Sequence, residues 1–189
     1  MFRWIGLGAL GLLASCSSSL DTTRVPMSSS AASPGVPGSS SGAVTEELSR
    51  SLERYRASIG REAIPRHAGL DKLAREHCEF MARNRGKFNV SSANISHYGF
   101  ESRAFAAQKM YGMGHCAENV AGGVIHGDIA AELTKAWVGS SKHSYNIKQK
   151  WHATGLGVYV ASDGFVYATQ IFAMKEQSGM ANHGRFGIF

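Results

Sequence analysis

The chain has 189 residues, a formal net charge of +6 and three cysteines. Its 20 lysines and arginines are spread along the sequence, with no basic block and no nucleic-acid-binding motif, so the composition argues against a nucleic acid as partner. Beyond residue 43, the remaining length suits one domain with a single hydrophobic core.

Residues 1–15, MFRWIGLGALGLLAS, have the layout of a secretory signal, with a basic residue, a short apolar stretch and small residues before a cysteine. The stretch is too short for a membrane-spanning helix. Leu13 to Cys16 resemble a bacterial lipobox, in which cleavage leaves a lipid-modified cysteine; the alternative is an ordinary signal peptide with an accidental cysteine. We therefore expect a lipid on Cys16 to anchor the protein durably outside the cytoplasm. Ser17 favours the outer membrane, if the host has one.

Residues 16–43 are rich in serine, proline and glycine and contain few large apolar side chains. Such a segment buries too little surface to offset the entropy lost on ordering, so we predict a lipidated flexible tether. The segment includes GSSSG, which formally matches the G-x-S-x-G nucleophile elbow of hydrolases. That motif needs a strand before it and a helix after it, and this composition predicts neither.

Hydrophobic spacing predicts four helices in the rest of the chain. The first covers residues 44–59, with Thr45 as a possible N-cap. The second covers residues 70–82, where apolar side chains recur at intervals of three and four. Two more are expected over residues 101–110 and 128–137, and Trp137 lies on the apolar side of the last one.

Strand patterns follow these helices. Residues 117–125, AENVAGGVI, are β-branched and bounded by glycines, and they predict one strand. The stretches ATGLGVYVAS and FVYATQIFA alternate around Asp163 and Gly164, which predicts a hairpin with a tight turn. Helices on both sides of a small antiparallel sheet indicate an α+β domain, a three-layer α/β/α sandwich. Residues 175–189 have no clear period and form a C-terminal tail that either wraps the surface or is mobile.

The cysteines leave two interpretations open. The triplet Cys116-Ala117-Glu118 resembles part of a zinc deaminase site, but that site needs a later P-C-x-x-C element, and Pro65 and Cys116 are the last residues of their kinds. A deaminase is therefore excluded. With Cys16 assigned to the lipid, Cys78 and Cys116 could form a disulfide in an oxidising compartment. The alternative is two buried free thiols that behave as small apolar side chains.

Five motifs in order resemble the CAP superfamily, the SCP-like extracellular domains of the bacterial YkwD type. They are His97, Glu118-Asn119, a Trp-x-x-Ser-x-x-His motif in AWVGSSKH, the strand TGLGVYV and the strand YATQIFA. The motifs cover about residues 44–174, which the resemblance identifies as a CAP domain. It implies the same α/β/α sandwich that the periodicity suggests.

The resemblance also implies a central cleft that brings together two histidines and two acidic residues. His97 matches the first histidine, Glu118 the acid of the Glu-Asn motif and His143 the second histidine. Glu101 is the candidate for the second acid, because it is the only acidic residue between His97 and Glu118. In a helix it would share a face with His97, although the same spacing suits a surface pair.

Two neutral imidazoles and a carboxylate could hold zinc through His97, Glu118 and His143 and leave one position open. The resemblance implies that some clefts of the family bind a divalent metal. The alternative assigns both histidines a structural role, and His115 would be the spare ligand if zinc binding differs from the family pattern. For Asn119 we favour a buried amide that holds neighbouring backbone.

Two classes of function remain. The first, which we predict, is a non-enzymatic binding module whose cleft, with Ser140 at its border, meets a lipid, a wall component or a partner protein. The second is a hydrolase, in which Ser140 or Ser141 acts with His143 and Glu118, or Glu118 activates a metal-bound water. Ser140 and His143 are only one helical turn apart, and no oxyanion-hole element is apparent, which argues against the serine version.

Overall fold

The computed structural model describes residues 41–87, 95–176 and 187–188. The predicted signal peptide, the lipidation site Cys16, nearly all of the predicted tether and most of the C-terminal tail lie outside the described residues. Within the described part of the chain, no helix combines the length and the apolar character needed to cross a membrane.

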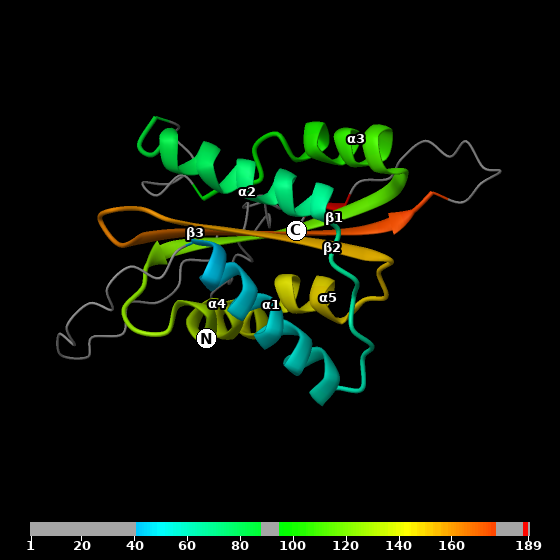
Figure 1. Cartoon of the computed structure of the whole chain (residues 1–189), viewed down its shortest axis with the longest axis horizontal. Helices are drawn as coiled ribbons and strands as arrows, with labels where there is room; N and C mark the ends of the chain where they lie inside the picture. Colours follow the sequence, from blue (N-terminus) through cyan, green and yellow to red (C-terminus); the bar gives the residue numbers. More distant parts are fainter. Residues whose placement is uncertain (1–40, 88–94, 177–186, 189) are drawn as a thin grey trace, which may run out of the picture.

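A four-stranded sheet lies between two layers of helices (Figure 1). The strands are β1 (Met113–Val124), β2 (Ala153–Val160), β3 (Phe165–Lys175) and β4 (Gly187–Ile188), in the order β2-β3-β1-β4. The pairs β2–β3 and β3–β1 are antiparallel, and β4 runs parallel to β1 beside Ala117 and Glu118.

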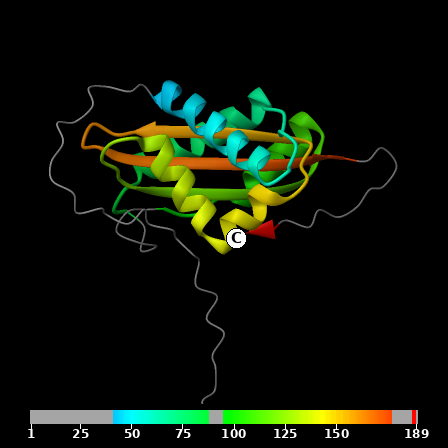
Figure 2. The ribbon, with the colours of Figure 1, turned by 90° about the horizontal axis from the view of Figure 1, so that it is seen from below.

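Helices cover both faces of the sheet (Figures 1 and 2). The first layer holds α2 (Ala68–Arg83) and α3 (Phe100–Tyr111); the second holds α1 (Ser41–Ser58), α4 (Ile129–Gly139) and α5 (Ser141–Lys148). The predicted three-layer α/β/α sandwich is therefore confirmed. The prediction of four helices needs two corrections, because the described residues contain a fifth helix, α5, and because α1 begins at Ser41, inside the predicted tether. Thr45 is not its N-cap but donates from Oγ1 to the carbonyl oxygen of Ser41 at 2.7 Å.

The predicted hairpin joins β2 to β3. Its turn is closed by two hydrogen bonds, from the Gly164 N–H to the Ala161 carbonyl (3.0 Å) and from the Ala161 N–H to the Phe165 carbonyl (2.8 Å). Gly164 has a φ of 79°, a conformation that glycine adopts without a steric penalty. Asp163 accepts from the N–H of Phe165 through Oδ1.

The two glycines of TGLGVYV allow α2 to pack directly on β2. A Cβ added to Gly155 would overlap the backbone of Leu70, and one added to Gly157 would overlap the backbone of Arg75. This close approach fixes the height of α2 above the sheet, and hence the position of the side chains that α2 presents next to β1.

Side chains of β1 alternate between the two helical layers, as they must in any strand. Cys116 packs with Phe100 of α3, whereas Ala117 and Ala121 join the core formed by α1 and α4, which includes the fully buried Trp137. Side chains at positions 116, 118 and 120 therefore face α2 and α3, and those at 117, 119 and 121 face α1, α4 and α5. Consecutive residues of the Glu-Asn motif consequently point to opposite faces of the sheet.

The disulfide considered between Cys78 and Cys116 is not formed, since both cysteines are free and buried. The Cys78 thiol lies 3.3 Å from the hydroxyl of Thr169 on β3. Cys116 is instead paired with Ala173 of β3. Ala173 is four residues beyond Thr169, which is about 13 Å along the strand at the usual rise per residue. The two side chains belong to separate parts of the core, too far apart for a bridge that needs its Cα atoms within about 7 Å.

Candidate functional site

The candidate site is built around the buried carboxylate of Glu118, in the middle of β1. Its side chain is 0% exposed and faces α2 and α3. Arg103 of α3 donates from Nε to Oε2 and from Nη2 to Oε1, both at 2.8 Å. The Nδ1 atom of His97 lies 3.0 Å from Oε1. Because an ionised carboxylate only accepts hydrogen bonds, Nδ1 of His97 carries a proton and donates it to Oε1.

Two partners keep this carboxylate ionised. Burial by itself raises the pKa of Glu118, but the hydrogen bond from His97 and the charge of Arg103 oppose it and lower the pKa from 4.5 to about 2. Glu118 and Arg103 thus form a buried, bidentate ion pair whose charges cancel, and both carboxylate oxygens are engaged.

His77 of α2 lies beside this pair and is 2% exposed. Its Nε2 lies 2.8 Å from the carbonyl oxygen of Ser96, to which it donates. Burial lowers the pKa of His77 from 6.5 to about 4, so the ring is neutral near pH 7. It stacks on Phe80 with ring centroids 6.2 Å apart, and Phe80 in turn stacks on Tyr98 at 5.6 Å.

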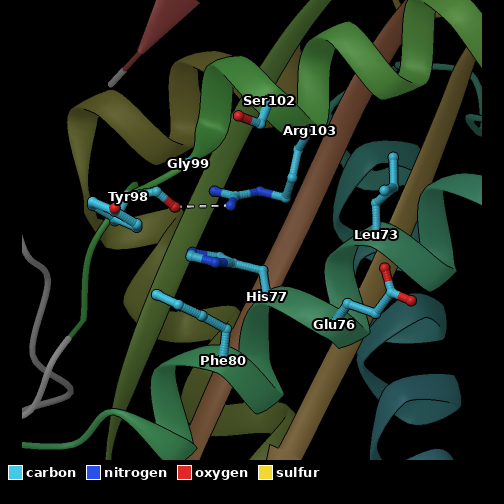
Figure 3. Close-up of a pocket in the computed structure, with 8 residues that line it drawn as sticks. All are labelled: Leu73, Glu76, His77, Phe80, Tyr98, Gly99, Ser102 and Arg103. Carbon is cyan, nitrogen blue, oxygen red and sulfur yellow. Dashed lines mark hydrogen bonds between the residues drawn. The ribbon is translucent and has the colours of Figure 1, made fainter.

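A pocket of about 250 Å³ opens between α2 and the start of α3 (Figure 3). Figure 3 shows the Arg103 guanidinium lying above the His77 ring, with Phe80 on the other side of that ring. Arg103 connects the pocket with Glu118, and its Nη1 donates to the Tyr98 carbonyl at 2.9 Å. The lining residues are Leu73, Glu76, His77, Phe80, Tyr98, Gly99, Ser102 and Arg103.

The predicted set of His97, Glu118 and His143 is not assembled, because His143 belongs to the opposite face of the sheet. It lies in α5, where its backbone carbonyl accepts from Nδ2 of Asn119 at 3.1 Å. Asn119 also accepts, through Oδ1, from Nδ2 of Asn146 at 2.9 Å. The role predicted for Asn119, a buried amide that holds neighbouring backbone, is confirmed. Sequence order had placed His143 in the cleft without showing which face α5 covers.

The other predicted site residues also lie away from the Glu118 carboxylate. Ser140 is the N-cap of α5, where its Oγ accepts from the N–H of His143, so the Ser140–His143–Glu118 triad is wrong. Glu101 is exposed in the first turn of α3, and Arg103, two residues later, contacts Glu118 instead. His115 stacks on Trp151 with ring centroids 5.6 Å apart.

Zinc does not fit the ligand set that the sequence suggested. Arg103 and His97 occupy both oxygens of Glu118, a guanidinium already supplies the positive charge there, and His143 lies beyond the sheet. Among the residues that the structure describes, no three or more His, Cys, Asp or Glu side chains are grouped so that they could hold a metal ion. We therefore derive no metal chemistry at this site.

Sequence reasoning missed Arg103 and His77 as site residues, although His77 falls within the apolar stripe of the helix predicted over residues 70–82. The stripe itself carried a signal for His77, because a histidine among apolar residues at helical spacing needs a polar partner once it is buried. No local signal distinguished Arg103 from a surface arginine.

No family model matches the chain, and no similar curated protein was found. Solved structures do resemble it. An outer surface protein of Borrelia burgdorferi superposes with a TM-score of 0.60 at 16% identity, over 72% of this chain and 96% of that one.

Two further structures support the CAP fold. A cysteine-rich secretory protein of Staphylococcus aureus gives a TM-score of 0.55 at 16% identity and covers 74% of this chain. An extracellular protein of Bacillus anthracis containing an SCP domain gives 0.54 at 22% identity and covers 76%. The chain has the CAP, or SCP-like, fold. It spans only 40% and 45% of these two proteins, so the likeness concerns only a part of each.

Proposed function

We propose that this protein is a lipid-anchored member of the CAP superfamily, of the YkwD type, that acts outside the cytoplasm as a non-enzymatic binding module. Two neighbours in fold are described as a secretory and an extracellular protein, and a third as an outer surface protein. The lipobox-like residues before Cys16 supply the expected anchor. If the host has an outer membrane, Ser17 favours attachment there.

The ligand site that we propose is the pocket beside Glu118. The observation that carries binding over catalysis is the ion pair itself: Arg103 and His97 engage both oxygens of Glu118, so this carboxylate is held behind Arg103, which lines the pocket. The nucleophile suggested by sequence, Ser140, caps a helix on the other face. Burial raises the pKa of both thiols, Cys78 and Cys116, to about 12, which keeps them in the unreactive protonated form.

A hydrolase is the second candidate, and one observation favours it. His97 donates from Nδ1 to a carboxylate, which is how a general base is oriented in many hydrolases. Incubating the purified protein with peptide, ester and glycan substrates separates the two functions. The binding module should leave all of them intact, whereas turnover that His97→Ala abolishes would establish the hydrolase.

The direct test of binding is native mass spectrometry of the full-length protein purified from its own membrane. We expect a bound compound in the wild-type protein and a reduced amount in Tyr98→Ala, because the exposed Tyr98 ring forms one wall of the pocket. Tyr145→Ala is the matched control, since Tyr145 is similarly exposed on α5, across the sheet. Equal retention by the three proteins, or no bound compound at all, would count against the pocket.

The anchor is tested separately. Cys16→Ser should release the protein from the membrane fraction, and unchanged retention with an unacylated N-terminus would contradict the lipoprotein assignment.

A further inference from the structure

We infer that the pocket beside Glu118 binds an extended peptide through one aromatic residue, whose ring packs against Leu73, Phe80 and Tyr98 while a neutral carbonyl of the peptide accepts a hydrogen bond from Arg103. This inference rests on the proposed binding function and specifies the ligand of the same pocket.

The first argument is the hydrogen-bonding capacity that Arg103 has left. A guanidinium carries five N–H groups. Arg103 uses three of them, two for Glu118 and one for the Tyr98 carbonyl, and its side chain remains 12% exposed. Two N–H groups therefore have no acceptor among the described residues. Since Arg103 also lines the pocket, an acceptor on the ligand can complete the set.

The second argument is charge. The positive charge of Arg103 is already balanced by Glu118, so an anionic ligand gains little from it. Glu76 also lines the pocket, with its side chain 51% exposed and its Oε1 3.9 Å from Nζ of Lys72 in an exposed ion pair, so an anion would approach a carboxylate there as well. A neutral carbonyl satisfies the free N–H groups without either conflict, and the peptide backbone offers one at every residue.

The third argument is size and shape. An apolar cavity of about 150 Å³ holds benzene, so a pocket of about 250 Å³ accommodates one six-membered ring with its attachment to a chain. Phe80 and Tyr98 stack with 6° between their ring planes, and both line the pocket. Tyr98 is 62% exposed at the rim, where an arriving aromatic side chain would cover it. Aromatic rings at binding interfaces commonly carry much of the affinity.

The test uses full-length protein with Cys16→Ser, which needs no detergent, and follows binding by calorimetry. The probe is N-acetyl-L-phenylalaninamide, a neutral compound with one ring and two amide carbonyls. N-acetylglycinamide lacks the ring, N-acetyl-L-phenylalanine adds a carboxylate, and toluene lacks the carbonyl. We expect measurable binding of the first probe only, or binding at least fivefold tighter than that of the other three.

Two variants locate the binding. Tyr98→Ala removes the exposed ring but keeps the backbone carbonyl that accepts a hydrogen bond from Arg103. This variant should lower the affinity for the neutral probe about fivefold or more. Tyr145→Ala should bind as the parent protein does. Equal affinity of toluene and the neutral probe would overturn the role of Arg103, and unchanged binding by Tyr98→Ala would overturn the location.

The remaining outcomes separate this inference from the proposed function. If the neutral probe does not bind but Tyr98→Ala still loses the compound that co-purifies with the wild-type protein, the ligand class is wrong and the binding module stands. Binding of decanoate in place of the neutral probe would likewise reject the peptide in favour of an acyl chain. If the probe does not bind and no variant changes what co-purifies, both proposals fail.

Discussion

Replacing Arg103 with methionine should destabilise the domain by about 3 kcal/mol, because Glu118 would keep its burial and lose its strongest partner. Removing one member of a buried ion pair typically costs about 3–5 kcal/mol. The pKa of Glu118 gives a second figure of similar size. It is lowered from 4.5 to about 2, and this difference corresponds to about 3 kcal/mol of net stabilisation of the ionised form.

The pH dependence has a definite sign. Because the pKa of Glu118 is lower in the folded state than in the unfolded chain, its contribution is fully present above pH 4.5 and is lost as the pH falls towards 2. Glu118→Gln should therefore flatten the decline in the free energy of unfolding across this range, relative to the wild-type protein.

Urea unfolding followed by circular dichroism measures these effects. The double variant Arg103→Met/Glu118→Gln should recover much of the loss seen in Arg103→Met, since no buried charge is left unpaired. Arg54→Met is the control, because Arg54 pairs with Glu47 at 2.9 Å on an exposed surface and should matter little. Two results would show that the buried ion pair does not stabilise the fold as described. One is an equal loss of unfolding free energy in Arg103→Met and Arg54→Met, and the other is strictly additive effects in the double variant.

Three more predictions concern single residues near the sheet. Since burial lowers the pKa of His77 to about 4, the free energy of unfolding should decrease as the pH falls from 6.5 to 4, and His77→Phe should flatten that decrease in urea titrations at successive pH values. Gly157→Ala should cost at least about 1–3 kcal/mol in thermal or urea unfolding, because its Cβ overlaps α2, whereas Gly139→Ala, with no atom within 4 Å, should be tolerated. Cys78 and Cys116 should resist alkylation in the native protein and react once it is unfolded; rapid native labelling, counted by mass spectrometry, would contradict their burial.

Local patterns were sufficient for the layers of this fold and for the hairpin. Alternating apolar residues on either side of Asp163 and Gly164 define two strands and a turn. The two strands that pair are consecutive in the sequence, so no distant segment is needed to form the hairpin. The same rule of alternation puts Glu118 and Asn119 on opposite faces of β1. Alternation alone therefore predicts that the two side chains of the Glu-Asn motif have different surroundings. Glu118 lies next to the pocket, and Asn119 holds the backbone of α5.

The composition of the site could not be obtained in the same way. Whether His143 joins Glu118 depends on which face of the sheet α5 covers, and the periodicity of α5 shows only that one of its sides is buried. Arg103 reaches Glu118 because α3 lies across β1, a contact between elements that the spacing of residues in α3 does not encode. For this reason the order of motifs grouped His143 and Glu101 with His97 and Glu118, although the structure brings only His97 and Glu118 together.

The proposed binding site is confined to the face of the sheet that α2 and α3 cover. Amide chemical shifts test this directly, when N-acetyl-L-phenylalaninamide is added to full-length, isotope-labelled protein with Cys16→Ser. The largest shifts should fall on Tyr98, Gly99 and Ser102, around the pocket, and α5 should be unaffected. Shifts centred on His143 and Ser144 in α5, across the sheet, would contradict the proposed location.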